Sequence, residues 1–149
     1  MADLLHPRQI LLADDDKDDI LLFQEAFEQL LVPGKITIVH NGEELMQLLD
    51  NEKSFPDILF LDLNMPRKNG LDCLSAIKKT KKLQMVPVVI FSTSYEVAVV
   101  NQLYATGAQY YMRKPNDFTA LKNVIGQALA LTSAFKLSQP PRDKFVLSS

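Results

Sequence analysis

Charged and hydroxyl side chains follow directly on short apolar runs of this sequence. Asp14 and Asp15 come after "ILLA", and Asp62 ends the run "DILFLD". Ser92 ends "PVVIFS", and Lys114 ends "QYYMRK". Carboxylates that are brought together need a cation, and an all-oxygen site open to water suits a hard divalent ion such as Mg²⁺. The acidic residues therefore predict a magnesium site, provided that the fold gathers them.

The same residues predict phosphoryl chemistry. A lysine opposite a carboxylate, a nearby hydroxyl and a bound Mg²⁺ together stabilise the charge that builds on the non-bridging oxygens of a phosphoryl group in transfer. Asp62 is then the natural nucleophile, because its carboxylate can attack phosphorus and form an acyl phosphate. Mg²⁺ and Lys114 would neutralise the charge, and Ser92 would donate a hydrogen bond to one oxygen.

Two alternating periodicities predict how the chain brings these residues together. Short apolar runs rich in branched residues predict strands, and the segments between them have apolar residues at helical spacing. One helical face contains Ile20, Phe23, Phe27, Leu30 and Leu31, and another contains Phe118, Leu121, Ile125, Ala128 and Leu129. The predicted strands are residues 9–13, 35–40, 57–62, 87–92 and 109–114.

A strand followed by a helix, five times over, predicts an α/β fold. Helical crossovers of this length connect parallel strands, so we expect a doubly wound five-stranded parallel sheet covered by helices on both faces. Residues 9–13, 58–61 and 88–91 are apolar at nearly every position, which is typical of central strands. Ligands bind such sheets at the carboxyl ends of the strands. The residues named above therefore converge on one edge.

Composition excludes several classes of function. A chain of 149 residues suits one domain. The net charge of −2 gives no general attraction to nucleic acid. His6 and His40 have no partners at metal-ligand spacing, so neither histidine predicts a metal site.

A single cysteine, Cys73, fits a reducing compartment. No apolar run approaches the roughly 18 residues of a membrane span, and the first residues do not resemble a signal peptide. We expect a cytoplasmic protein that contacts no membrane.

Five motifs resemble those of the response-regulator receiver domains of two-component signalling. They are the acidic pair in "LLADD", the phosphoacceptor context "LFLDLNMPRKNG", the hydroxyl in "VVIFSTS", the aromatic Tyr111, and "KP" at Lys114 and Pro115. The match covers about residues 8 to 130, with the spacing of the family. It implies a flavodoxin-like (βα)5 fold with strand order 2-1-3-4-5. "DLNMPRKNG" and "FSTS" are similar to the single-domain receivers paired with bacterial phytochrome kinases.

The resemblance assigns roles at the site. Asp62 corresponds to the phosphoacceptor, which takes a phosphoryl group from a phosphohistidine of a partner kinase. Asp15 corresponds to a direct Mg²⁺ ligand and Asp14 to a ligand that binds through water. The backbone carbonyl of Asn64 corresponds to the third protein ligand. Lys114 corresponds to the lysine that stabilises the phosphoryl group.

The resemblance also implies a switch. Ser92 and Tyr111 correspond to a pair in which the hydroxyl moves toward the phosphoryl group while the aromatic ring turns inward, which remodels a protein-binding face. Thr93 is an adjacent alternative to Ser92, although the spacing and the strand phase favour Ser92. The bond from Lys114 to Pro115 is expected to be cis, as in the family.

The acidic run "DDDKDD" (residues 14–19) divides into two parts. Asp14 and Asp15 are taken as the metal pair because they follow the last apolar residue of the strand, with Asp16 the third candidate. Asp16, Asp18 and Asp19 are expected to open the first helix, where carboxylates cap amides and favour the helix dipole.

Other functions of the same site remain as alternatives. A phosphorelay intermediate would pass the phosphoryl group on to a further protein. An aspartyl-phosphate phosphohydrolase would need an acid two residues after the nucleophile, where this chain has Asn64. We therefore expect no enzyme activity beyond the protein's own phosphorylation and dephosphorylation.

Three segments are expected: an N-terminal extension (1–7), the receiver domain (8–131) and a C-terminal tail (132–149). The tail is too short for an output domain, and "QPP" breaks any helix. We therefore expect a stand-alone receiver whose partners are a sensor histidine kinase or phosphotransfer protein and a downstream protein target. The run "KFVL" could dock on the domain or on a second subunit of a homodimer, and the sequence leaves both open.

Overall fold

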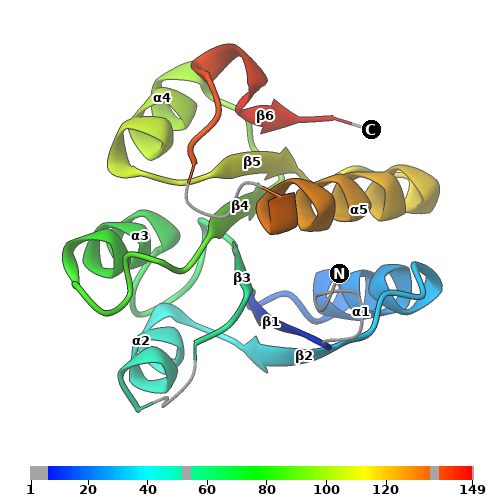
Figure 1. Cartoon of the computed structure of the whole chain (residues 1–149), viewed down its shortest axis with the longest axis horizontal. Coiled ribbons are helices and arrows are strands. Elements are labelled where there is room, and N and C mark those ends of the chain that lie inside the picture. The colour runs from blue at the N-terminus through cyan, green and yellow to red at the C-terminus, as the bar shows by residue number, and fades with distance from the viewer. Residues whose placement is uncertain (1–6, 52–54, 135–137, 149) are drawn as a thin grey trace.

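The chain folds around a parallel sheet with helices on both faces (Figure 1). The computed structural model describes residues 7–51, 55–134 and 138–148. The strands are β1 (Arg8–Ala13), β2 (Gly34–Val39), β3 (Ile58–Leu61), β4 (Val88–Ser92), β5 (Tyr110–Arg113) and β6 (Val146–Leu147). The helices are α1 (Lys17–Gln29), α2 (Gly42–Asn51), α3 (Gly70–Lys79), α4 (Val97–Thr106) and α5 (Phe118–Ala134), with a 3₁₀ turn, η2 (Arg142–Lys144).

The sheet order is β2-β1-β3-β4-β5-β6, and every pair is parallel. The doubly wound flavodoxin-like topology with strand order 2-1-3-4-5 is thus confirmed, and a sixth short strand extends it. Helix α5 runs to Ala134, three residues beyond the expected end of the receiver at 131.

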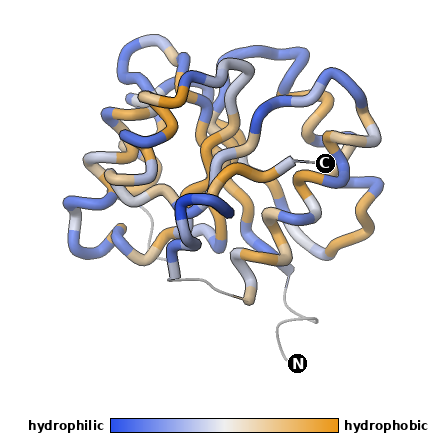
Figure 2. Tube along the Cα trace, turned by 90° about the horizontal axis from the view of Figure 1, so that it is seen from above, coloured by the Kyte–Doolittle hydropathy of each residue, from blue (hydrophilic) through white to orange (hydrophobic). Residues whose placement is uncertain are grey.

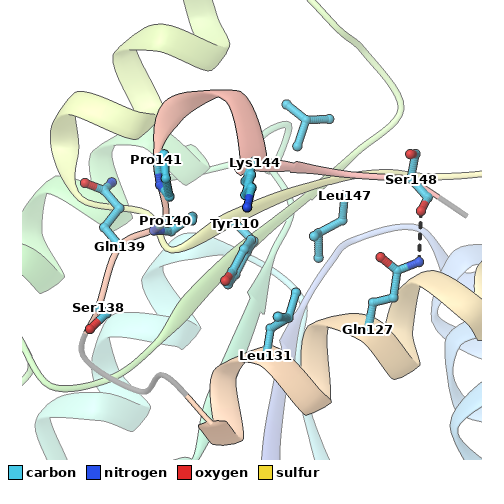
Figure 3. A pocket seen from close by; sticks show the side chains of 11 residues that line it. Tyr110, Gln127, Leu131, Ser138, Gln139, Pro140, Pro141, Lys144, Leu147 and Ser148 are labelled. Carbon is cyan, nitrogen blue, oxygen red and sulfur yellow. Dashed lines mark hydrogen bonds between the residues drawn. The ribbon is translucent and has the colours of Figure 1, made fainter.

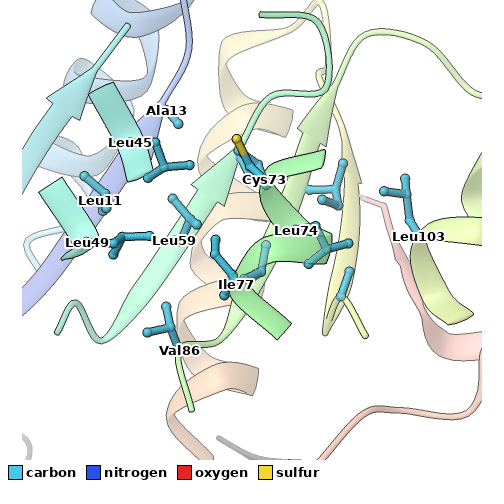
Figure 4. Packing of buried hydrophobic residues seen from close by; sticks show 14 of the residues in the cluster. Leu11, Ala13, Leu45, Leu49, Leu59, Cys73, Leu74, Ile77, Val86 and Leu103 are labelled. Carbon is cyan, nitrogen blue, oxygen red and sulfur yellow. The ribbon is translucent and has the colours of Figure 1, made fainter. Parts of the chain in front are cut away.

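Each face of the sheet has its own hydrophobic core. Helices α1 and α5 cover one face, and α2, α3 and α4 cover the other (Figure 1). Successive side chains of a strand point to opposite faces, so Leu11 joins the core under α2 and α3, whereas Ile10 and Leu12 join the core under α1 and α5. Figure 4 shows Leu11 and Leu59 directed toward α2 and α3. Hydrophobic residues concentrate on the central strands, and hydrophilic ones on the outer loops (Figure 2).

The predicted buried faces of the first and last helices are largely confirmed. Ile20, Phe23 and Phe27 are buried in α1, as are most of the predicted residues of α5. Leu31 is an exception, because its side chain is 87% exposed. Helix α1 ends at Gln29, and Leu31 lies beyond it with a φ of 57°, so it no longer continues the helical face.

Residues 138–148, which we call the C-terminal segment, pack on the domain itself. Phe145 is fully buried against Tyr104 of α4, with ring centroids 5.1 Å apart. The backbone N–H of Tyr111 donates to the Phe145 carbonyl at 3.0 Å, which begins the pairing of β6 with β5. The Tyr104 hydroxyl donates to the Pro140 carbonyl at 2.7 Å. Of the two docking alternatives, the structure has the segment on the body of the domain.

Candidate functional site

Three carboxylates meet at the carboxyl edge of the sheet. One carboxylate oxygen from each of Asp14, Asp15 and Asp62 lies within 4.8 Å of the others. Asp14 follows β1 and is fully buried, Asp62 follows β3 and is 6% exposed, and Asp15 is exposed. The strand pairing continues into these residues, because the Asp62 N–H donates to the Ala13 carbonyl at 2.9 Å. The sheet register therefore brings together carboxylates that lie far apart in the sequence.

Backbone amides hold two of these carboxylates in place. Asp14 Oδ1 accepts a hydrogen bond from the Asp16 N–H at 3.0 Å, and Asp62 Oδ1 accepts one from the Asn64 N–H at 3.4 Å. The loop after β3 also depends on Gly70 at the start of α3, because a Cβ there would collide with the Asp62 carbonyl. A larger residue at this position would displace the backbone that carries Asp62.

Lys114 reaches the same cluster from the end of β5. Its Nζ lies 2.8 Å from Asp14 Oδ2, 2.9 Å from Asp19 Oδ2 and 3.7 Å from Asp62 Oδ2. Burial alone would lower the pKa of Lys114, but the hydrogen bonds with Asp14 and Asp19 and the charge of Asp62 raise it above its ordinary value. The lysine is therefore a fixed positive charge among the carboxylates.

The electrostatics of Asp62 follow from its position. Burial raises its pKa to about 7; the positive charge of Lys114 opposes this shift, and the negative charge of Asp14 adds to it. Near neutral pH, Asp62 is thus partly protonated, unless a cation joins the cluster and favours the carboxylate. The three carboxylates of the cluster outnumber the single positive charge of Lys114.

The donor set fits a hard divalent cation. The three clustered groups are all carboxylates, and the exposed Asp15 leaves room for coordinating water. Oxygen ligands that include several waters are what Mg²⁺ prefers in proteins. Asp14, Asp15 and Asp62 would hold the ion. The Asn64 carbonyl stays a prediction, because the contact seen from Asn64 is made by its N–H.

Ser92 and Tyr111 form a second group beside the cluster. Ser92 is fully buried at the end of β4, and its Oγ lies 3.2 Å from Ser94 Oγ. The Tyr111 hydroxyl donates to the Ser94 carbonyl, and its side chain is 1% exposed. Burial raises the pKa of Tyr111, and hydrogen bonds with Ser92 and Ser94 oppose that shift. The two predicted switch residues are therefore linked through the loop after β4, with the aromatic ring in an inward position.

One expectation at the site is wrong. Every peptide bond in the described part of the chain is trans, including the bond from Lys114 to Pro115. The trans form is the intrinsically favoured one for a bond to proline. It is compatible here with the pairing of the strand ends, since the Lys114 N–H donates to the Ser92 carbonyl at 2.8 Å.

Asp19 is the site residue that sequence reasoning missed. The sequence suggested that it helps to open α1, and its backbone N–H does bond to the N-cap Asp16 at 3.0 Å. Its side chain, however, turns to Lys114. One sequence feature could have indicated this contact: Asp19 lies in the first turn of a helix that begins at the same edge of the sheet as Asp14.

A separate apolar pocket lies between α5, β5 and the C-terminal segment (Figure 3). Tyr110, Leu131 and Leu147 line it together with Pro140 and Pro141. It shares no residue with the acidic cluster. In the described part of the chain, no helix combines the length and apolar character needed to cross a membrane.

Comparison with known proteins agrees with this geometry. The family model of the response regulator receiver domain matches residues 10–126. The probable methanogenesis regulatory protein FilR2 of Methanothrix harundinacea is 31% identical over 80% of this chain and 79% of its own length. Response regulator Rcp1 of Synechocystis is 29% identical over 80% of this chain and 84% of its own.

Solved structures of response regulators are similar as well. The phosphorylated cyanobacterial phytochrome response regulator RcpA superposes with a TM-score of 0.78 and 31% identity, over 91% of this chain and all of the other. The Mn²⁺-bound form of Rcp1 gives a TM-score of 0.75 with 27% identity, over 91% of this chain and all of the other.

Proposed function

This chain belongs to the response regulator receiver family, and from that premise we propose that Asp62 accepts a phosphoryl group from the phosphohistidine of a sensor histidine kinase or phosphotransfer protein. The arrangement of Lys114 and the carboxylates around Asp62 carries this proposal. Asp62 Oδ2 lies 3.7 Å from the lysine Nζ, and the other two carboxylates of the cluster are close enough to share one cation with it.

The transfer is a displacement at phosphorus. A carboxylate oxygen of Asp62 forms a bond to phosphorus while the bond from phosphorus to the histidine nitrogen breaks, and the leaving imidazole keeps that electron pair and takes a proton from solvent. Bound Mg²⁺ supplies positive charge at the non-bridging oxygens. Lys114 stabilises another oxygen by its fixed charge, and Ser92 donates a hydrogen bond once it has moved toward the phosphoryl group.

The output is a change in a protein-binding face. We infer that movement of Ser92 alters the loop that contains Ser94, and that the inward position of the Tyr111 ring, which its hydrogen bond to the Ser94 carbonyl holds, depends on that loop. A downstream protein would bind the remodelled face formed by α4, β5 and α5 together with the C-terminal segment, which packs across this face. The likeness to the cyanobacterial phytochrome response regulator RcpA supports a phytochrome-type kinase as the phosphodonor. We expect the transfer to take place in the cytoplasm.

Hydrolysis of an external substrate has less support. Position 64, two residues after the nucleophile, is an asparagine, whose amide cannot supply the proton that a leaving group needs. A role as a phosphorelay intermediate uses the same chemistry at Asp62 and differs only in the acceptor.

Acetyl phosphate with Mg²⁺ tests the proposal. The wild type should gain one phosphoryl group at Asp62, detected by intact mass and peptide mapping, whereas Asp62→Asn should gain none. Asp72→Asn is the matched control, because Asp72 is an exposed aspartate on α3. Equal modification of Asp62→Asn and wild type would refute the assignment.

A further inference from the structure

Asp19 lies outside the carboxylate cluster but binds its lysine. Its carboxylate is 2.9 Å from Lys114 Nζ, and its side chain is 30% exposed. It comes from the first turn of α1, whereas Asp14 approaches the same ammonium group from the end of β1 at 2.8 Å. Two different elements thus hold one ammonium group by short ion pairs.

The number of N–H donors on Lys114 limits how many acceptors it can bind at once. An ammonium group has three N–H donors. Asp14 and Asp19 are each within hydrogen-bond distance and use two of them, while Asp62 at 3.7 Å is too distant for a third bond. The third N–H is used by no carboxylate and is available in the space toward Asp62, while the Phe91 ring lies 4.9 Å from the same Nζ. An oxygen of a phosphoryl group on Asp62 would extend into this space.

We infer that Asp19 is a positioning residue for phosphoryl transfer, which fixes Lys114 so that its remaining N–H faces the phosphoryl oxygen. The inference rests on the proposed function of Asp62. A donor that is already oriented costs no reorganisation as charge develops. Without Asp19, only Asp14 anchors the ammonium group among the carboxylates, and the ammonium can rotate away from the reacting oxygen.

The role of Asp19 in the helix can be separated from its role toward the lysine. The hydrogen bond to the N-cap Asp16 uses the backbone N–H of Asp19, which a side-chain substitution leaves in place. Asp18 is the neighbouring acidic residue in the same first turn and is exposed. Asp18→Ala therefore removes the same charge from the same helix end and serves as the matched control.

The experiment measures the rate constant of phosphorylation by acetyl phosphate at saturating Mg²⁺. Asp19→Ala should lower it about tenfold relative to Asp18→Ala, which is the order expected for losing a hydrogen bond to a charged group. Asp19→Asn should restore the rate to within about threefold of wild type, because its amide oxygen still accepts from the ammonium. In a Lys114→Met background, Asp19→Ala should have no additional effect.

Three outcomes would overturn the inference. They are equal rates for Asp19→Ala and Asp18→Ala, failure of Asp19→Asn to restore the rate, and a full tenfold loss in the Lys114→Met background. Thermal unfolding checks that each variant is folded, and Asp19→Ser replaces the alanine variant if that one is not. A wild type that is not modified at Asp62 would instead refute the proposed function.

Discussion

Two lysines at opposite edges of the sheet have opposite electrostatic surroundings. Lys114, at the carboxyl edge, contacts three carboxylates, and its pKa is raised. Lys78, in the last turn of α3, donates to the Val86 carbonyl at 3.1 Å, near the start of β4. Burial lowers the pKa of Lys78 to about 8. Among the described residues, the structure pairs Lys78 with no carboxylate.

The difference shows what each edge requires of a cation. At the amino edge, Lys78 satisfies two carbonyls, and its aliphatic part lies under Gly107 of the α4 C-cap. A neutral side chain of similar length could fill this space. At the carboxyl edge, the charge itself is needed, because Asp14 and Asp62 are buried next to each other. We expect substitutions at the two lysines to have very different effects.

The largest effect should come from Lys114→Met. Removal of the cation leaves buried carboxylates uncompensated, so the free energy of unfolding should fall by about 2 to 4 kcal/mol at pH 7.5 without Mg²⁺. Urea denaturation measures the change, and Lys78→Met is the control. A similar loss in both variants would mean that charge at the carboxyl edge is not special.

Asp62→Asn should instead raise the free energy of unfolding. The folded pKa of Asp62 is raised to about 7, so the folded state holds this proton more tightly than the unfolded state, and its stability falls as pH rises from about 4 to 7. Replacing the carboxyl group should therefore stabilise the metal-free protein by roughly 1 to 3 kcal/mol at pH 7.5. The gain should fade toward pH 4. A gain that does not depend on pH would contradict this explanation.

Mg²⁺ should give a stabilisation of intermediate size. A cation that binds the native cluster raises the free energy of unfolding by about 1.4 kcal/mol at tenfold its dissociation constant. Thermal unfolding with and without Mg²⁺ measures this shift, which Asp15→Asn should largely remove. The same shift in Asp15→Asn and wild type would place the ion elsewhere.

Lys78→Met should have the smallest effect, less than about 1 kcal/mol at pH 7, because the loss of its hydrogen bonds to two carbonyls opposes the gain from removing a buried charge. Between pH 8 and 10.5 the unfolded state keeps the Lys78 proton while the folded state releases it, so the free energy of unfolding rises with pH across this window. The difference in stability between wild type and Lys78→Met should follow that rise. A constant difference from pH 7 to 10.5 would show that Lys78 stays charged in the fold.

Much of the site could be predicted because parallel strands share a carboxyl edge. Asp14, Asp62 and Lys114 each follow an apolar run, and strand order alone is enough to bring them together. Asp19 could not be assigned in this way, because its contact with Lys114 depends on the direction of a side chain at the start of a helix. Sequence spacing does not determine that direction.

The sixth strand could not be predicted from the sequence for a different reason. Val146 and Leu147 form only two residues of strand, which is too short for a periodic pattern to reveal. Their position is determined by tertiary contacts, above all by the burial of Phe145 against Tyr104. The run "KFVL" indicated an apolar contact, but nothing local to it specified which surface would receive it. The motif "KP" suggested a cis bond before Pro115, and nothing in the sequence indicated the trans bond that the structure has.

The parallel direction of β6 matters for how the protein is handled in the laboratory. Because β6 runs alongside β5, it brings Ser148 to the edge of the sheet where Lys114 lies, and both line one surface hollow with Thr93. Strand β1 begins at the opposite edge with Arg8. An affinity tag or fluorophore placed beyond Ser148 would emerge next to the carboxylate cluster that we propose as the phosphorylation site, whereas one placed before Arg8 would leave that edge of the sheet clear.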